Sequence, residues 1–520
     1  MSTSLVSAAE SYPLTINSRR RAALQEIDIA PFTWFHARVC LVAGIGFFTD
    51  AYDIFAINIA SVMLGYVYGP QDTHQLNTKQ NLGIKVATPI GTLLGQLVFG
   101  WLADRVGRKR MYGIELMIII VATFAQSLSG SGRRGGPVGT IGVLIMGIGI
   151  GGDYPLSAVI SSEFAPMRVR GRMMAAVFSS QGWGAFVAAL VALITVAAYH
   201  ESILANPAHV DDVWRILIGL GCVPGCIGLY YRLTIPETPR FTMDIERNVQ
   251  QASDDIRNVL TTGTSTVDPD APICRVNAPK ATWADFRAYF GQWKNGKVLL
   301  GTAWSWFALD IAFYGLGLNN SVLLNVIDFD TPSSTGSHLI YNTLLDTCIN
   351  NLIFSAGGLL PGYYFAFLFI DSWGRKPIQL MGFTILAILF IVLGFGYDKL
   401  NATDAAKRGF IVLVCFANFF QNFGPNTTTF TVPGEVFPTR YRSTAHGISA
   451  ASGKFGAVVA QVVLIARDVG GPNRFIKHIL EIFAFFMLTG ILSTLLIPET
   501  KGLSLEELSN EKQEGFIRSN

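Results

Sequence analysis

Charged residues are scarce in this chain. Only 14% of its 520 residues are Asp, Glu, Lys or Arg, whereas a soluble globular protein carries about 25%. The 39 Lys and Arg against 36 Asp and Glu give a net charge of +3, which is too small an excess to indicate nucleic-acid binding. Half of the residues are hydrophobic. The composition therefore predicts a membrane protein.

Several common functional signatures are also missing. The six cysteines are scattered, and Cys222 and Cys226 have no second pair that would complete a metal site. No GxxxxGK[ST] loop occurs, which argues against an ATP-driven pump. The glycines of residues 147–151 follow no strand, so they do not indicate a dinucleotide site. We expect no cofactor, no metal and no enzymatic activity.

Long apolar segments are abundant. A helix needs about 20 apolar residues to cross a bilayer, and twelve segments meet this requirement. The polar N-terminus has no cleavable signal pattern, so the first span doubles as the insertion signal. The sequence predicts an all-α polytopic membrane protein. The predicted spans are residues 36–65, 81–103, 111–130, 138–163, 173–199, 213–235, 296–326, 341–370, 377–397, 409–433, 443–466 and 475–497.

The two halves of the chain repeat each other. The motif that starts at Asp104 recurs at Asp371, the Pro-Glu-Thr at Pro236 recurs at Pro498, and Glu163 has a counterpart further along. That counterpart is Glu435, and the three offsets are 267, 262 and 272 residues. A nearly constant shift indicates a duplicated unit of six spans. Transporters built in this way place the substrate near the midplane, between the halves.

Lys and Arg in short loops predict the orientation. They concentrate in the loops between spans 2 and 3, 4 and 5, 8 and 9, and 10 and 11, which predicts that both termini are cytosolic. We expect a cytosolic tail (1–35), a six-helix bundle (36–235), a linker (236–295), a second bundle (296–498) and a cytosolic tail (499–520). Within the linker, aromatic residues at helical spacing from Trp283 to Trp293 predict either a helix at the membrane surface or a plain amphipathic linker helix.

Polar residues lie deep within several predicted spans. An ionisable residue at membrane depth is costly and therefore indicates a functional site. Trp306, Asp310 and Tyr314 are spaced to share one face of a helix. The remaining amides and aromatic residues also have a purely structural interpretation, as hydrogen-bonding or packing groups between helices. The deep residues singled out are Asp50, Asp53, Asp153, Tyr154, Gln181, Trp306, Asp310, Tyr314, Asn426 and Lys454.

A second group of charged residues lies at the predicted cytosolic ends of the spans. Carboxylates and guanidinium groups pair well in two-point contacts, so these residues predict a latch between helices that acts in structure or gating, away from the substrate. The predicted cytosolic gate consists of Asp104, Arg108, Glu163, Asp371, Arg375 and Glu435.

Longer motifs carry a family resemblance. GWLADRVGRK (100–109) and the repeated Pro-Glu-Thr resemble the sugar-porter branch of the major facilitator superfamily. GGDYPLSAVISSE (151–163), LDIAFYGLGLNNS (309–321) and residues 422–457 are similar to the fungal and plant high-affinity phosphate:proton symporters, nearest the fungal members. Sugar porters carry a glutamine pair in span 7 where this chain has WSWFALDIAFYG, which argues against hexose.

The resemblance implies a proton-coupled phosphate importer of the plasma membrane that works by alternating access. By position, phosphate would contact Tyr154, Gln181, Trp306, Asp310, Tyr314 and Asn426. Asp50, Asp53, Asp153 and Asp310 would form the proton path, and Lys454 would balance charge. A proton-coupled porter for an organic anion or a sugar, and a phosphate receptor that does not transport, are the alternatives. The expected partners are phosphate, protons and lipid, with no nucleic acid.

Overall fold

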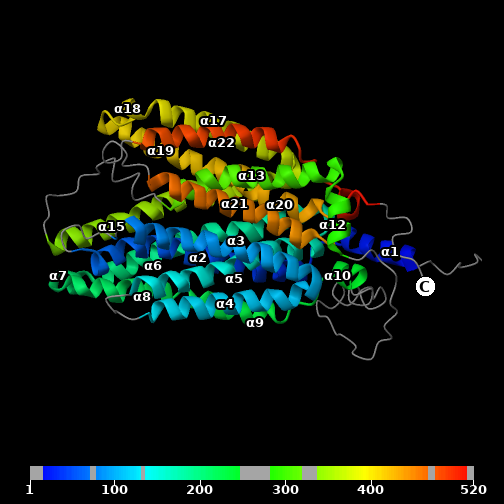
Figure 1. Ribbon diagram of the computed structural model, residues 1–520, viewed down its shortest axis with the longest axis horizontal. Coiled ribbons are helices and arrows are strands. Elements are labelled where there is room, and N and C mark those ends of the chain that lie inside the picture. The colour runs from blue at the N-terminus through cyan, green and yellow to red at the C-terminus, as the bar shows by residue number, and fades with distance from the viewer. Residues whose placement is uncertain are drawn as a thin grey trace, which may run out of the picture.

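The computed structural model describes residues 16–70, 76, 78–129, 135–245, 281–318, 336–465 and 475–511. Within these ranges every regular element is a helix. Most helices run side by side along the long axis of the molecule (Figure 1). The predicted all-α fold is therefore confirmed. The end of predicted span 7 (319–326) and most of the linker (246–280) lie outside the described residues.

The first half of the chain supplies six long helical segments that run along the bundle. We call each of these segments a row, whether it is one helix or consecutive helices. They are α2 (Trp34–Tyr68), α3 (Thr78–Val106), α4 (Arg108–Ser127), α5 (Gly135–Phe164), α6 (Arg170–Ala198), and the pair α8 (Val210–Gly219) and α9 (Cys222–Arg232). Two short elements, α7 (His200–Ala205) and the 3-10 turn η2 (Pro207–His209), connect α6 to α8, and the 3-10 turn η1 (Met167–Val169) precedes α6.

The second half supplies six more rows, two of which contain a π-helical turn. They are α13 (Trp293–Gly317), α15 (Ser337–Phe354) with η3 (Ser355–Leu359) and α16 (Leu360–Trp373), α17 (Arg375–Phe395), α19 (Asp404–Gln421) with η4 (Asn422–Asn426) and α20 (Thr427–Val436), α21 (Arg442–Ile465), and α22 (Ile476–Thr494). A short helix, α18 (Tyr397–Leu400), precedes α19.

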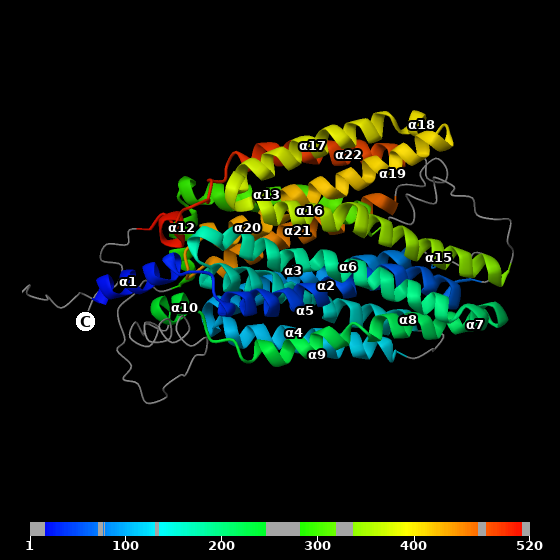
Figure 2. The ribbon, with the colours of Figure 1, turned by 180° about the vertical axis from the view of Figure 1, so that it is seen from behind.

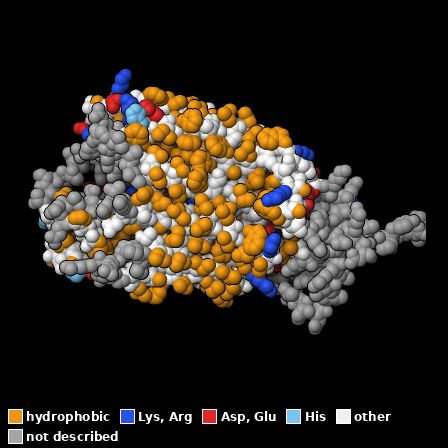
Figure 3. All heavy atoms as spheres, in the orientation of Figure 1, with side chains coloured by type: hydrophobic (Ala, Val, Ile, Leu, Met, Phe, Trp, Pro, Cys, Tyr) orange, Lys and Arg blue, Asp and Glu red, His pale blue; other side chains and the backbone are white. Residues whose placement is uncertain are grey.

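Nine helices of the described part are long and apolar enough to cross a membrane by themselves. The other three rows, α4, α19–α20 and α21, contain more charged and polar residues but lie alongside the nine (Figures 1 and 2). Hydrophobic side chains form a broad band around the middle of the visible face, and charged side chains gather towards its two ends (Figure 3). This surface is that of an integral membrane protein.

The two ends of the bundle differ. One end carries α1 (Ile16–Ile29), α10 (Pro239–Asp244), α12 (Trp283–Phe290) and α23 (Leu505–Leu508), and we call it the α1 end (right in Figure 1). The other end carries α7 and α18, and we call it the α7 end. The sequence indicated only polar tails at 1–35 and 499–520, whereas the structure places α1 and α23 within them. The sequence pattern did not predict these two helices, because the apolar face of each is short. Such a face is buried only by contact with other segments, as Ala23 and Leu24 are against Met243.

Glycines allow α5 to approach α3 closely. A Cβ at Gly151 would overlap the carbonyl oxygen of Thr92 and lie 2.8 Å from the amide nitrogen of Gln96. A Cβ at Gly147 would lie 2.6 Å from the carbonyl oxygen of Thr88. Because small residues let helix backbones come together in a membrane, these positions require glycine. The halves meet where α3 packs on α21 and where α6 packs on α15 and α16.

Candidate functional site

A buried ion pair lies between α13 and α21. Lys454 Nζ donates to Asp310 Oδ2 at 2.9 Å and to the hydroxyl oxygen of Tyr314 at 3.0 Å. Asp310 and Lys454 are 1% and 2% exposed. Both belong to the second half of the chain, so the carboxylate and the ammonium group come from facing helices of one bundle. A charge at this depth is tolerated because its partner lies within hydrogen-bonding distance.

Four polar side chains form a hydrogen-bonded row that crosses from one half to the other. Gln181 Nε2 donates to the hydroxyl of Tyr154 at 3.0 Å, both in the first half. The hydroxyl of Tyr363 lies 3.5 Å from Gln181 Oε1 and accepts from Asn426 Nδ2 at 3.0 Å. The row therefore joins α5 and α6 to α16 and η4. Sequence reasoning missed Tyr363, because one tyrosine among the many aromatic residues of its span gives no distinguishing signal.

Aromatic rings close the space around these polar groups. The ring of Tyr154 lies 6.3 Å from that of Trp306 and 4.9 Å from Lys454 Nζ. The rings of Phe178 and Phe430 stack at 4.4 Å across the two halves. The six residues expected to contact phosphate thus lie in one buried region, connected through Lys454, Tyr154 and Tyr363. This region contains hydroxyl, amide and indole groups together with one carboxylate and one ammonium group.

A break in the α19–α20 row positions Asn426. The π-helical turn η4 contains Phe423 and Gly424 with non-helical backbone angles, and Pro425 has no N–H to continue the helix. Gly424 lies against Gly382 of α17, where a Cβ would be 2.8 Å from the Cα of Gly382. The amide of Asn426 donates to the side chain of Asn422 at 2.7 Å as well as to Tyr363. Turns of this kind often mark functional sites.

Asp153 belongs to a separate cluster of buried charges in the first half. Asp153 Oδ2 accepts from Arg232 Nη2 at 2.8 Å, and Asp153 Oδ1 accepts from the hydroxyl of Ser157 at 2.6 Å. Arg232 also pairs with Glu115. These ionic groups are almost fully buried. Sequence reasoning missed Glu115 and Arg232, because each lies near a span end, where a charged residue is ordinary.

Asp50 and Asp53, the other two first-half aspartates of the predicted proton path, lie on α2. Thr123 donates to Asp53 Oδ2 at 2.9 Å. Both carboxyl oxygens of Asp50 are buried and have no hydrogen-bond partner among the described residues. An unpaired carboxylate in such a place is costly. Asp50, Asp53 and Asp153 thus belong to the first half and the Asp310–Lys454 pair to the second, and no hydrogen bond joins these two groups among the described residues.

The predicted gate residues meet at the α1 end and cross between the halves. Asp104 accepts from the backbone amides of Ser443 and Thr444, at 3.2 and 2.7 Å. These amides belong to the N-terminus of α21, where a carboxylate is favourable. Arg108 donates to the carbonyl oxygen of Thr439 at 2.7 Å. Glu163 lies 3.5 Å from Arg108 and 2.7 Å from Arg442.

The second copy of the motif makes equivalent contacts. Asp371 accepts from the backbone amides of Gly171 and Arg172 at the start of α6, at 3.1 and 2.9 Å. Arg375 pairs with Asp371 at 2.9 Å and with Glu435 at 2.8 Å. Each copy thus places an aspartate of one half on a helix N-terminus of the other half. Both sets of contacts join the two halves at the α1 end.

The repeat also extends to the backbone of the two turns. Gly107 and Gly374 both have positive φ, at 113° and 101°. After each glycine, backbone amides of the next helix donate to a glutamate, Glu237 in the first half and Glu499 in the second. The internal duplication inferred from sequence is therefore present in three dimensions.

A pocket adjoins the ion pair on the side towards the α7 end. Its lining includes Asn58 of α2, Lys85 and Thr92 of α3, and Tyr314 and Lys454. Helices of both halves thus contribute to it. The pocket thus lies on the opposite side of the ion pair from the contacts that join the halves at the α1 end. Among the described residues, no group of His, Cys, Asp or Glu could hold a metal ion.

Comparison with known proteins agrees with this architecture. A family described as "Sugar (and other) transporter" matches residues 39–308 and 342–511. The structure of the proton:xylose symporter XylE bound to 6-bromo-6-deoxy-D-glucose matches with a TM-score of 0.67 and 20% identity, covering 91% of this chain and 98% of that chain. The inward open conformation of the xylose transporter XylE from E. coli gives a TM-score of 0.58 at 20% identity, covering 91% of this chain and 99% of that chain. At this level of identity these matches show the fold alone.

Two fungal relatives are much more similar in sequence. The repressible high-affinity phosphate permease of Neurospora crassa is 49% identical, over 95% of this chain and 90% of the relative. The inorganic phosphate transporter PHO84 of Saccharomyces cerevisiae is 47% identical, over 94% of this chain and 87% of the relative. The putative inorganic phosphate transporter 1-13 of Oryza sativa subsp. japonica is 38% identical, over 94% of each chain. The chain therefore belongs to the sugar (and other) transporter family of the major facilitator superfamily, in its group of fungal and plant phosphate permeases.

Proposed function

We propose that this protein imports inorganic phosphate together with protons, across the plasma membrane, by alternating access. The observation that carries the proposal is the buried Asp310–Lys454 pair beside the row of hydroxyl and amide donors between the two halves. The names of the similar permeases support phosphate as the substrate. The positive-inside distribution supports cytosolic termini, so that the α1 end faces the cytosol.

Phosphate needs both donors and an acceptor. Its oxygens accept hydrogen bonds, and its monovalent form also carries O–H groups that donate. Tyr154, Gln181, Trp306, Tyr314 and Asn426 supply hydroxyl, amide and indole donors, and Asp310 supplies an acceptor. Tyr363 joins this set because it links Gln181 to Asn426. Such a site holds an anion without a guanidinium group, which favours release as well as binding.

Proton coupling follows from competition for Lys454. While Asp310 is ionised, it engages the ammonium group of Lys454 and repels phosphate. Protonation of Asp310 removes that repulsion and leaves Lys454 to balance the charge of the bound anion. When the site faces the cytosol, Asp310 loses its proton and recovers Lys454, so phosphate leaves. The proton and the phosphate are therefore transported together, because Lys454 pairs with Asp310 and with phosphate in turn.

The cluster of aspartates in the first half supplies the rest of the proton path. Asp153 is held by Arg232, whereas Asp50 has no partner among the described residues, so the neutral, proton-bearing form of Asp50 costs least. Asp53 continues the path along α2, three residues further on. Each anion charge moved against an inside-negative potential costs about 2.3 kcal/mol per 100 mV. Cotransport of more than one proton with each monovalent phosphate would reverse that cost.

The remaining predicted residues act in gating. Asp104, Arg108, Glu163, Asp371, Arg375 and Glu435 hold the cytosolic end closed while the site is open to the outside. The bundles of residues 36–235 and 296–498 rock against each other when these contacts break. The linker 236–295 allows this motion, and α12 within it lies at the membrane surface with Trp283 exposed.

Uptake of labelled phosphate into proteoliposomes tests the proposal. The purified full chain should accumulate phosphate when the outside is more acidic than the inside, and the accumulation should collapse when a protonophore abolishes the gradient. Unlabelled phosphate should compete, whereas hexoses and carboxylates should not. Uptake that is insensitive to the gradient would contradict proton coupling. Competition by a sugar or an organic anion would favour another substrate, and binding without uptake would favour a receptor.

A further inference from the structure

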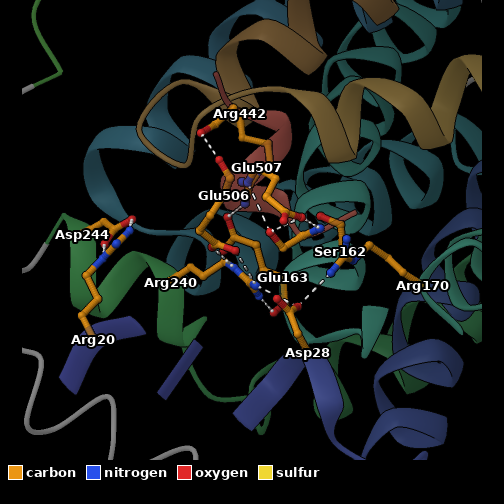
Figure 4. A network of polar contacts seen from close by, with 12 residues as sticks. Arg20, Asp28, Ser162, Glu163, Arg170, Arg240, Asp244, Arg442, Glu506 and Glu507 are labelled. Atoms are coloured by element: carbon orange, nitrogen blue, oxygen red, sulfur yellow. Dashed lines mark hydrogen bonds and ion pairs between the residues drawn. The ribbon is translucent and has the colours of Figure 1, made fainter. Parts of the chain in front are cut away.

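The helix α1 is fixed to α10 by a buried ion pair and a small apolar contact. Arg20 Nε and Nη2 donate to the two carboxylate oxygens of Asp244 at 2.6 and 2.9 Å (Figure 4). The two side chains are only 2% and 5% exposed. Leu24 and Ile27 of α1 are buried together with Met243 of α10. The N-terminal helix is therefore an integral part of the α1 end, although it precedes the first span.

The last turn of α1 supplies a carboxylate that two arginines share. Asp28 Oδ1 accepts from Arg170 Nη2 at 2.9 Å and from Arg240 Nη2 at 3.2 Å (Figure 4). Both arginines are almost completely buried. Two buried guanidinium groups this close together repel each other unless an anion lies between them. Asp28 occupies that place.

The same two arginines reach the C-terminal segment of the chain. Arg170 Nη1 donates to the carbonyl oxygen of Leu503 at 3.0 Å. Arg240 Nε donates to Glu506 Oε1 at 2.9 Å. Arg240 Nη1 also donates to the backbone carbonyl of Glu163, a residue of the gate, at 2.6 Å. Because residues 503 and 506 follow the last span, these contacts tie the first half of the protein to the end of the second.

We propose that α1 is a gating element of the transport cycle, with Asp28 as its positioning residue. Asp28 orients Arg170 and Arg240 so that they hold the C-terminal segment and keep the α1 end closed. Opening of this end separates the halves and breaks both contacts. The proposal rests on the alternating access proposed above, and it assigns a role in that cycle to a helix outside the twelve spans.

The accessibility of a buried residue at the same end tests this role. Ser443 is fully buried where α21 meets Asp104, so Ser443→Cys reports opening of the α1 end through its reaction with N-ethylmaleimide. The reaction is measured in detergent on the peptide that contains position 443, since Cys226 is exposed and also reacts. Asp28→Asn should make the reaction about tenfold faster, which corresponds to about 1.4 kcal/mol. Glu26→Gln is the matched control, because it removes a charge from the same helix and Glu26 forms no ion pair within the described part of the chain.

The outcomes separate this proposal from its alternatives. Equal reaction rates in the parent and in Asp28→Asn would overturn it, and so would an equally fast reaction in Glu26→Gln, since that result would reflect net charge alone. Arg20→Gln, which loosens α1 from α10, should accelerate the reaction in the same direction. It provides an independent check if Asp28→Asn does not fold. The assay contains no phosphate and no pH gradient, so it does not depend on the identity of the substrate.

Discussion

At the scale of single residues, the chemistry depends on which partner each buried charge has. Asp310 pairs with Lys454, and Asp153 pairs with Arg232, so two aspartates that look alike in the sequence have different surroundings. Asp310 faces the row of donors, whereas Asp153 belongs to a cluster with its own fixed cation. In the proposed mechanism Asp310, and not Asp153, joins a proton to an anion, because Lys454 also donates to Tyr314 of the candidate site.

Replacement of Asp310 by asparagine should separate binding from coupling. Asp310→Asn mimics the protonated carboxyl, so the variant should still bind phosphate but lose the dependence of uptake on a pH gradient. Initial uptake rates from pH 5 to 8 measure this. Asp346→Asn, which changes another aspartate of the second half outside the site, should keep the wild-type profile. A wild-type pH profile in Asp310→Asn would remove Asp310 from the coupling mechanism.

Sequence reasoning could name most of these residues but not their pairing. Depth within an apolar span was enough to single out Asp50, Asp153, Asp310 and Lys454, because a buried charge is costly wherever it lies. The distance between Lys454 and Asp310 depends on how α21 packs against α13, which no local pattern specifies. For Arg232, the sequence did not predict even that the residue is buried. It was overlooked because its position at the end of α9 suggested contact with water, yet the neighbouring helices enclose it completely.

At the scale of helices, close backbone contact and broken helical geometry position the site. The glycines of α5 bring its backbone against α3, and the turn η4 presents Asn426 to Tyr363. Both features were visible in the sequence as glycines and prolines within apolar segments. Their consequence was only partly predictable. A glycine shows where another helix backbone can come close, but it does not specify which helix does so.

A methyl group at Gly151 should destabilise the first bundle. The added Cβ would overlap the Thr92 carbonyl, and overpacking of this kind typically costs about 1–3 kcal/mol. Gly151→Ala should therefore lower the melting temperature of the detergent-solubilised protein. Gly83→Ala on α3 is the control, because a Cβ there meets nothing within 4 Å. Equal melting temperatures in the two variants would show that α3 and α5 are not packed as closely as described.

At the scale of the whole molecule, the closed α1 end depends on residues from both tails and both halves. Burial by itself would raise the pKa of Glu506, but its ion pair with Arg240 outweighs this effect and lowers the pKa to about 2. A carboxyl whose folded-state pKa is depressed stabilises the fold above its unfolded pKa, and the contribution disappears as the pH falls towards the folded pKa. Glu506 therefore contributes fully at neutral pH.

The pH dependence of stability should report this contribution. The difference in melting temperature between wild type and Glu506→Gln should be constant from about pH 7 to pH 5.5 and should shrink as the pH falls below about 4.5. A pKa depressed by this amount corresponds to roughly 3 kcal/mol at neutral pH. Glu26→Gln should give no such trend. A difference that stayed constant down to pH 3 would show that Glu506 is not held by Arg240.

The sequence by itself determined the membrane class, the duplicated unit of six spans, the charged turns and the cost of each deep ionisable residue. These properties depend on composition, segment length and local spacing, all of which can be read directly from the sequence. Only the tertiary structure decided which charges pair, that Tyr363 links the two halves, and that the tail helix α1 belongs to the closed end. Each of these depends on contacts between segments that are far apart in sequence, and such contacts form only when the helices pack.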